Sequence, residues 1–284
     1  MSTEIATSIL ANVLTTVLYV AIAAVALMAT IVSNKRRLLM LFGVNGRSAS
    51  INIYLSRLIV KAGAIETVEP VTKGYEGPVI FRLEHMGAQG IADLFRSKFL
   101  AKTPARLREW LSHRSPELSE VRVLIDTSPE SMDNLDTSTM VMIGSGVYNS
   151  LTKYYLDDHP DSFFRFEKQP DGNRAVQVRR GPRKHQLLRG RGRDAEDREL
   201  AIVQRLVDRE TGRTAIVCAG MSTSSSYGAA RYLVQDWQRL AKRSMGGEFG
   251  VVLSFPHQIN DVQRTDLVVE PTVLDEMFGG GPGR

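Results

Sequence analysis

An apolar segment at the N-terminus limits the folds open to this chain of 284 residues more than any other feature. From Ile9 to Val32 the sequence reads ILANVLTTVLYVAIAAVALMATIV, and no residue between Ile5 and Asn34 is charged. A helix of about 20 such residues crosses the hydrocarbon core of a bilayer, whereas a buried core helix of this length carries charges on its outer face. A cleavable signal peptide has a basic start, but the only early charge here is Glu4. The sequence therefore predicts one transmembrane helix, in a membrane anchor formed by residues 1–37.

The charges that flank the apolar segment predict its orientation. Lys35, Arg36 and Arg37 follow it, and no Lys or Arg precedes it. Because positive charge stays on the cytoplasmic side, we expect a single-pass protein of the cell inner membrane with everything after Asn34 in the cytoplasm. The single cysteine, Cys218, excludes a disulfide within the chain and fits a reducing compartment.

After this segment, strand-like and helical patterns alternate. Strands are expected in short apolar runs, at Leu38–Val44, Pro78–Leu83, Val121–Asp126, Thr139–Gly144, Thr214–Gly220 and Glu248–Phe255. Helical periodicity is read at Ile51–Gly63, Gly90–Leu100, Pro104–Arg114, Ser145–Leu156, Glu199–Val207 and Tyr227–Lys242. Such alternation is typical of an α/β domain with a largely parallel sheet covered by helices, here expected at residues 38–278.

Residues that are typical of turns and loops predict the structure of two further segments. Pro170-Asp171-Gly172-Asn173 lies between FFRFEK and RAVQVRR and predicts a β-hairpin, inserted into the domain or added at an antiparallel edge. Residues 279–284, GGGPGR, form the tail of the sequence and are expected to be disordered.

Three loops rich in glycine and hydroxyl groups each follow an apolar run and precede a helical pattern. They read GVNGRSAS, GSGVYNS and AGMSTSSSYG. Ligands of open parallel sheets bind beyond the carboxyl ends of the strands, where glycine admits close approach and helix N-termini favour anions such as phosphate. The second and third loops predict a site for a nucleotide-type ligand, made of Gly144, Ser145, Gly146, Asn149, Gly220, Ser222, Ser224, Ser225 and Ser226. The alternative is that these residues only cap the next helices.

The remaining motifs argue against several classes of enzyme. No loop is a Walker A motif or a full G-x-G-x-x-G, so neither an ATPase nor a dinucleotide dehydrogenase is supported, and no cofactor is expected. The five histidines show no ligand spacing, so no metal site is expected. Four carboxylates are candidates for acid–base chemistry, namely Glu84, Asp126, Asp133 and Asp136. Asp126, at the end of a predicted strand, is the best placed, but aspartate there is also a common turn former, and no catalytic residue is assigned.

The segment Arg174–Arg193 contains no acidic residue. Its glycines and proline predict a mobile basic loop. A contact with lipid headgroups or with a phosphorylated ligand is the second interpretation. Nucleic acid is the third, since the segment lacks aromatic side chains for stacking.

A membrane helix followed by an α/β domain with such loops resembles the nucleotide-sensing effectors of bacterial antiviral signalling. The residues that carry the resemblance are IGSGVYN (Ile143–Asn149) and AGMSTSSSYG (Ala219–Gly228). In those systems a Rossmann-like sensor domain, CARF-like or LOG-like, binds a cyclic oligonucleotide or a nicotinamide nucleotide derivative, and the membrane segment then damages or depolarises the membrane. The resemblance implies a sensor whose cytoplasmic domain signals to the membrane helix. The single span departs from the pattern, and we expect a homo-oligomer because one helix cannot enclose a conducting path.

Two other functions fit the sequence. One is a membrane-tethered nucleotide N-glycosidase or ribosyltransferase, which needs little more than one carboxylate. The other is a non-catalytic adaptor. The strand-end loops distinguish the three functions, since a sensor presents amides and arginine, an enzyme presents a carboxylate of raised pKa, and an adaptor fills the loops with their own side chains.

Overall fold

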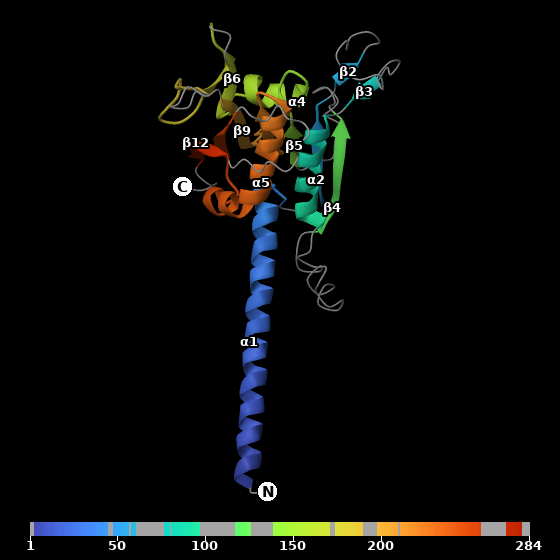
Figure 1. Cartoon of the computed structure of the whole chain (residues 1–284), viewed down its shortest axis with the longest axis vertical. Helices are drawn as coiled ribbons and strands as arrows, with labels where there is room; N and C mark the ends of the chain where they lie inside the picture. The colour runs from blue at the N-terminus through green and yellow to red at the C-terminus, as the bar shows by residue number, and fades with distance from the viewer. Residues whose placement is uncertain are drawn as a thin grey trace.

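The computed structural model describes residues 3–44, 48–56, 58–60, 77–79, 81–96, 117–125, 139–170, 174–189, 198–209, 211–256 and 271–279. In these residues a long N-terminal helix projects from a mixed α/β domain (Figure 1). Outside them lie the predicted helix Pro104–Arg114, the candidate carboxylates Asp126, Asp133 and Asp136, and residues 280–284 of the tail.

Helix α1 (Thr3–Leu41) contains the predicted apolar segment and continues past it without a break. It is long and apolar enough to cross a membrane, and its apolar stretch is not buried against the rest of the described chain. From Leu38 onward the helix enters the domain, where Leu38, Leu39 and Leu41 are buried. The strand predicted at Leu38–Val44 is therefore wrong, because this apolar run extends the helix and buries its final turn.

A seven-stranded sheet forms the centre of the domain, in the order β12-β11-β9-β10-β5-β1-β4. The strands are β1 (Ser48–Leu55), β4 (Glu117–Ile125), β5 (Thr139–Ile143), β9 (Arg198–Val207), β10 (Thr214–Gly220), β11 (Phe249–Pro256) and β12 (Thr272–Phe278). β4, β1, β5 and β10 are parallel neighbours. β9 is antiparallel to β10 and β11, and β12 is antiparallel to β11, so only β9 and β12 oppose the common direction. The sheet is mostly parallel, as the alternating pattern predicted.

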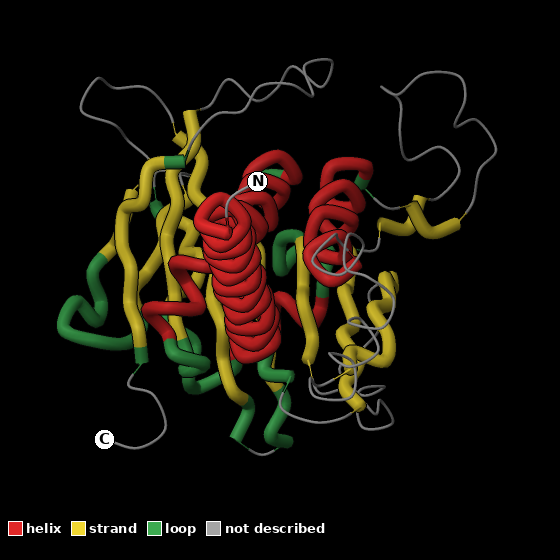
Figure 2. The backbone as a smooth tube through the Cα atoms, turned by 90° about the horizontal axis from the view of Figure 1, so that it is seen from below, coloured by secondary structure: helices red, strands yellow, loops and turns green. Residues whose placement is uncertain are grey.

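Each face of the sheet is covered by different elements. On one face, α2 (Arg82–Arg96), α5 (Thr223–Ser244) and the end of α1 pack on a core that includes Ile53, Val141 and Ile216. Helix α5 contacts both α2 and α1, and the helices lie close together (Figure 2). On the other face, the core around Met142 and Val217 is covered by α4 (Ser150–Lys153), the π-helix η3 (Tyr154–Asp158) and part of a second sheet.

This second sheet consists of β6 (Phe164–Lys168), β7 (Arg174–Val178) and β8 (Leu187–Arg189). β6 and β7 pair antiparallel across the predicted turn, and β8 pairs with β7. The described part of the basic segment thus forms the strands β7 and β8 and the turns between them, and its mobility stays a prediction. This sheet lies at the end of the domain away from α1 (Figure 1). The strands β2 (Leu58–Val60) and β3 (Gly77–Val79) form a separate pair.

Two segments read as helices are strands in the structure. Glu199–Val207 belongs to β9, and Ile51–Gly63 contains most of β1 and all of β2. In β9 the polar residues Gln204 and Arg205 are buried, so they did not mark the exposed face of a helix. In β1 both Asn52 and Tyr54 are buried on the face opposite the isoleucines, and this hides the two-residue period of a strand.

The end of α1 is attached to the amino edge of the parallel strands. Thr139, the first residue of β5, donates a short hydrogen bond to the carbonyl of Phe42. Gly43 has a φ of +70°, and a β-carbon there would overlap Thr214, the first residue of β10. Because this turn requires both a left-handed backbone and close approach, only glycine fits it.

Candidate functional site

The carboxyl ends of β1, β5 and β10 meet at the edge of the sheet opposite α1. Leu55 is aligned with Ile143, and Ile143 with Cys218. Gly144 follows β5, and its amide donates to the carbonyl of Cys218 at 3.1 Å. The loops that follow β5 and β10 therefore begin side by side at this carboxyl edge, as expected for neighbouring parallel strands.

A buried carboxyl group lies at the same edge. Glu84, in the first turn of α2, is 2% exposed. Its Oε2 accepts from the backbone amide of Ser56 at 3.1 Å, and its Oε1 accepts from the Ser56 hydroxyl at 3.1 Å. Burial raises the pKa of Glu84 to about 7, outweighing these two hydrogen bonds, which lower it. At neutral pH this carboxyl group is divided between its two protonation states.

Gly144 makes room for this carboxyl group. Its φ is +123°, and a β-carbon at this position would overlap the Ser56 hydroxyl and lie 2.8 Å from the Glu84 Oε1. Glycine is thus needed for the backbone conformation and for the approach of Glu84. The predicted role of Gly144 as a point of close approach is met by a side chain of the protein itself.

Two aromatic rings lie on the elements that flank Gly144 and Glu84. Tyr148, in the loop before α4, is 45% exposed, and its ring centroid lies 5.9 Å from that of the partly buried Phe81. The neighbouring Val147 is also exposed. Flat rings of this kind are surfaces on which nucleobases stack. Tyr148 and Phe81 were not predicted as site residues, although Tyr148 directly precedes the predicted site residue Asn149 in the second loop.

The other predicted residues of the β5 loop support the turn. Asn149 is buried and caps α4, with its Oδ1 accepting from the amide of Thr152 at 2.9 Å. Its Nδ2 donates to the carbonyls of Tyr54 and Ile143, which ties the ends of β1 and β5 together. The Ser145 carbonyl accepts from the amides of Tyr148 and Asn149.

Gly146 lies against the helix that follows this turn. A β-carbon at Gly146 would lie 3.1 Å from the Cα of Lys153, whose side chain is exposed. Gly146 therefore lets the turn pass close to a residue that carries a positive charge.

The serine-rich loop after β10 bonds mainly to itself. Ser222 caps α5: its hydroxyl accepts from the amide of Ser225 at 3.1 Å, and the Ser225 hydroxyl accepts from the amide of Ser222 at 2.9 Å. The Ser226 hydroxyl accepts from the amide of Gly220 at 3.0 Å and donates to the Ser222 carbonyl. This is the arrangement that the capping alternative describes. Ser224, half-buried in the first turn of α5, is not part of this capping box.

The N-terminus of α5 already has a carboxylate beside it. The Ser222 hydroxyl donates to Glu199 at a short distance. A negative side chain complements the positive end of the helix dipole and repels a second anion. On the rim of this loop, Arg174 donates to the carbonyl of Met221 at 3.4 Å. The basic segment therefore begins at the carboxyl edge.

Cys218 does not provide an accessible thiol at this edge, and the described residues provide no candidate metal site. Cys218 is fully buried in β10, and burial raises the pKa of its thiol. Within the described residues, no group of three or more His, Cys, Asp or Glu side chains is placed to hold a metal ion.

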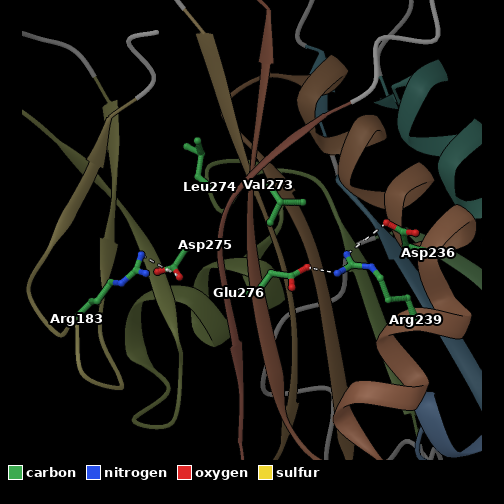
Figure 3. A pocket seen from close by; sticks show the side chains of 7 residues that line it. All are labelled: Arg183, Asp236, Arg239, Val273, Leu274, Asp275 and Glu276. Carbon is green, nitrogen blue, oxygen red and sulfur yellow. Dashed lines mark hydrogen bonds and ion pairs between the residues drawn. The ribbon is translucent and has the colours of Figure 1, made fainter. Parts of the chain in front are cut away.

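A separate hollow of about 490 Å³ lies along β12, with α5 on one side and the turn between β7 and β8 on the other (Figure 3). Arg183 lines it and pairs with Asp275 at 3.4 Å, while Arg239 pairs with Glu276 at 2.5 Å and with Asp236 at 3.4 Å. Because both arginines have carboxylate partners, this hollow does not select an anion.

Comparisons of the chain with family models, curated proteins and solved structures find no match in any of the three. The resemblance to nucleotide-sensing effectors stays a prediction. The functional proposal therefore depends on the geometry of the carboxyl edge.

Proposed function

We propose that the protein is a membrane-anchored sensor whose α/β domain binds a nucleotide-type ligand at the carboxyl edge of β1, β5 and β10. The supporting observation is the position of the exposed Tyr148 ring, packed against Phe81, on the turn that follows β5 and begins at Gly144, beside the buried carboxyl group of Glu84. In this arrangement the base stacks on Tyr148, and the phosphate lies at the turn near Gly146, where Lys153 supplies a positive charge. The parallel strands lie in the order β4-β1-β5-β10, which is the 2-1-3-4 order of flavodoxin-like sheets. With a site at their carboxyl ends, this order supports a Rossmann-like domain in the broad, doubly wound sense.

The proposed ligand position differs from the one that the sequence predicted. The amides of Gly144 and Gly220 have acceptors inside the protein, and so have the hydroxyls of Ser222 and Ser226. The phosphate is therefore assigned to the turn after β5, and Ser224 is the serine of the third loop, after β10, that we expect to contact the ligand.

Binding is tested on the full chain in mild detergent. Calorimetric titration with cyclic mono-, di- and oligonucleotides and with nicotinamide nucleotides should find at least one ligand. Tyr148→Ala should weaken that ligand, while Val147→Ser, which changes an exposed neighbour in the same turn, should not. If no nucleotide binds the parent protein at millimolar concentration, the proposal is wrong.

We further propose that α1 spans the cell inner membrane once, with the domain in the cytoplasm. The basic residues Lys35, Arg36 and Arg37 support this orientation, because they lie only on the domain side of the apolar segment. Val147→Cys provides an exposed thiol on the domain, and the buried Cys218 should stay unlabelled. An impermeant maleimide should label position 147 only after the inner membrane is opened. Labelling from the periplasm in cells with an intact inner membrane would contradict this orientation.

A sensor with one span has to act on the membrane through several copies, so we propose a homo-oligomer. Small residues such as Ala21 and Ala24 let neighbouring α1 helices approach closely. Light scattering of the detergent-solubilised protein should give a mass of more than one chain. A monodisperse monomer, with and without nucleotide, would contradict this. We assign the sensor to antiviral signalling on the resemblance in architecture alone.

Glu84 favours a second candidate function, a nucleotide N-glycosidase or ribosyltransferase. A carboxyl group with a pKa near 7 is suited to general acid–base chemistry at neutral pH. Incubation with each nucleotide that binds should then release free base, and Glu84→Gln should abolish the release while leaving nucleotide affinity intact. Absence of any product from every bound nucleotide would leave the sensor as the supported function.

A further inference from the structure

The amino edge of the parallel strands, at the other end of the domain, faces the membrane that α1 enters. α1 is continuous, so residue spacing gives heights above the apolar segment. From Val32, the last apolar residue of that segment, to Met40 the helix rises about 12 Å, at about 1.5 Å per residue. Met40 contacts the turn that follows α5, since a β-carbon at Gly246 would lie 3.5 Å from the Met40 Cε. The headgroup layer of one leaflet is about 5–8 Å thick, so this turn lies close above it.

Exposed apolar and basic side chains lie on and beside this turn. Met245, the C-cap of α5, is 65% exposed and has a φ of 48°, at a position where helices usually end in glycine. Lys242 is exposed one turn earlier in α5, and Arg36 and Arg37 are exposed on α1. An exposed apolar side chain among basic residues is typical of surfaces that lie in a membrane interface.

Two carboxylates at this end of the domain have cationic partners, whereas Asp93 near the end of α2 is exposed and Asp208 in the turn between β9 and β10 is buried. Glu248 pairs with Arg180 at 2.9 Å, and Glu276 pairs with Arg243 and Arg239. Arg243 is thereby neutralised, whereas Lys242, its neighbour in sequence, adds positive charge to the membrane-facing end of α5.

We propose that a basic underside, made of Arg36, Arg37, Lys242 and Met245, binds anionic lipid headgroups of the leaflet that α1 enters. The three cations contact the headgroup phosphates, and the Met245 side chain enters the interfacial layer. The partner is the bilayer itself, and the inference rests on the proposed insertion of α1. Docking of the underside holds the domain upright, with the carboxyl edge turned toward the aqueous phase.

The test uses three single-cysteine labels on the full chain in vesicles. Met245→Cys reports on the underside, Val147→Cys on the carboxyl edge and Ala24→Cys on the membrane span, while the buried Cys218 stays unlabelled. Each thiol carries a small fluorophore, and lipids with a spin label in the headgroup or in the acyl chain act as quenchers. Vesicles of phosphatidylcholine are compared with vesicles of phosphatidylcholine and phosphatidylglycerol.

The headgroup quencher should act at position 245 when phosphatidylglycerol is present, and the acyl-chain quencher should act at position 24 in both vesicles. Position 147 should not be quenched. In the labelled Met245→Cys protein, Lys242→Gln should lower the ratio of docked to undocked protein about fivefold. The matched change Lys168→Gln removes the same charge at the far end of β6, where Lys168 is exposed, and should have no effect.

Three outcomes would overturn the inference. One is quenching at position 24 without quenching at 245, which leaves the membrane anchor intact but shows an undocked domain. Another is equal quenching at 245 in neutral and anionic vesicles together with no effect of Lys242→Gln, which rules out the charge contribution. The third is an unquenched label at position 24, which rejects the insertion of α1 and with it the docking.

Discussion

The Nε of Arg205 donates a 2.7 Å hydrogen bond to the carbonyl of Leu41, the last residue of α1. Its Nη1 donates to the carbonyl of Gly247 at 2.9 Å, so one buried side chain of β9 joins α1 to the turn that follows α5. Burial lowers the pKa of Arg205 to about 10, which leaves the guanidinium charged at physiological pH. A buried cation at the negative end of a helix complements the dipole of α1.

We expect Arg205→Met to destabilise the domain strongly. Methionine preserves much of the apolar stem but leaves the carbonyls of Leu41 and Gly247 without this donor, at a cost of about 1–3 kcal/mol for each buried group. The control Arg209→Gln alters an exposed ion pair with Asp161 and should change stability by less than about 1 kcal/mol. Thermal unfolding in one detergent at fixed concentration compares the two variants. Equal melting temperatures for the parent and Arg205→Met would refute the role of Arg205 in joining α1 to the turn that follows α5.

The raised pKa of Glu84 predicts that the free energy of unfolding depends on pH. Its pKa is raised from 4.5 in the unfolded chain to about 7 in the folded protein, so the folded state binds more protons between these values. The free energy of unfolding should therefore fall as the pH rises from about 4.5 to 7, by up to about 3 kcal/mol from this residue. Glu84→Gln, which stays neutral, should flatten this slope and be more stable than the parent at pH 8. Denaturant titrations across this range measure both, and an unchanged slope in the variant would contradict the assignment.

Variants of Ser222 and Ser224 distinguish helix capping from ligand binding. Ser222→Ala removes the N-cap of α5 and should reduce the free energy of unfolding by about 1 kcal/mol. Ser224→Ala leaves the capping box in place and should weaken nucleotide binding with little change in stability. Melting curves and titrations of both variants provide the comparison. If Ser224→Ala changes neither quantity while Ser222→Ala changes stability, the serine-rich loop serves only as a helix cap.

Tyr148 and Lys153 should affect nucleotide affinity in different ways. Tyr148→Ala removes the stacking surface and should weaken binding about five- to a hundredfold at every salt concentration. Lys153→Gln removes a charge–phosphate contact, so its effect should shrink as salt screens that charge. Titrations at low and high salt test both. A salt-independent loss for Lys153→Gln would contradict the placement of the phosphate.

The sequence correctly predicted those helices and strands whose pattern of apolar and polar residues agrees with the burial of each residue in the fold. The apolar span of α1, the continuous apolar runs of β5 and β10 and the helical pattern of α5 were all read correctly. β9 was read as a helix because two of its interior residues are polar. The partners of Gln204 include the Phe163 amide and the Tyr155 carbonyl, and none of these contacts is visible in the local sequence.

The carboxyl edge was predicted from glycine and serine spacing, but its buried acid was only one of four candidates. Glu84 and Ser56 are separated by 28 residues, and only the packing of α2 on the sheet brings them together. Conversely, the serines after β10 gave the strongest sequence signal, yet Ser222 and Ser225 satisfy each other. A hydroxyl-rich turn cannot be assigned to a ligand from composition, because the same side chains suffice to cap a helix.

β5 connects the two ends of the domain directly. Thr139, its first residue, bonds to the carbonyl that follows α1, and Gly144, one residue past its end, lies against Ser56 and Glu84. A strand of 5 residues is about 17 Å long and has no hinge, so a displacement at its carboxyl end moves its amino end as well. In the proposed sensor, where α1 crosses the membrane, the unbroken helix would turn such a displacement into a tilt of the whole span. Tilting of a helix in a bilayer costs only fractions of a kcal/mol per Å of mismatch. For the proposed sensor, a modest difference in ligand affinity between two tilts would therefore be enough to change the angle.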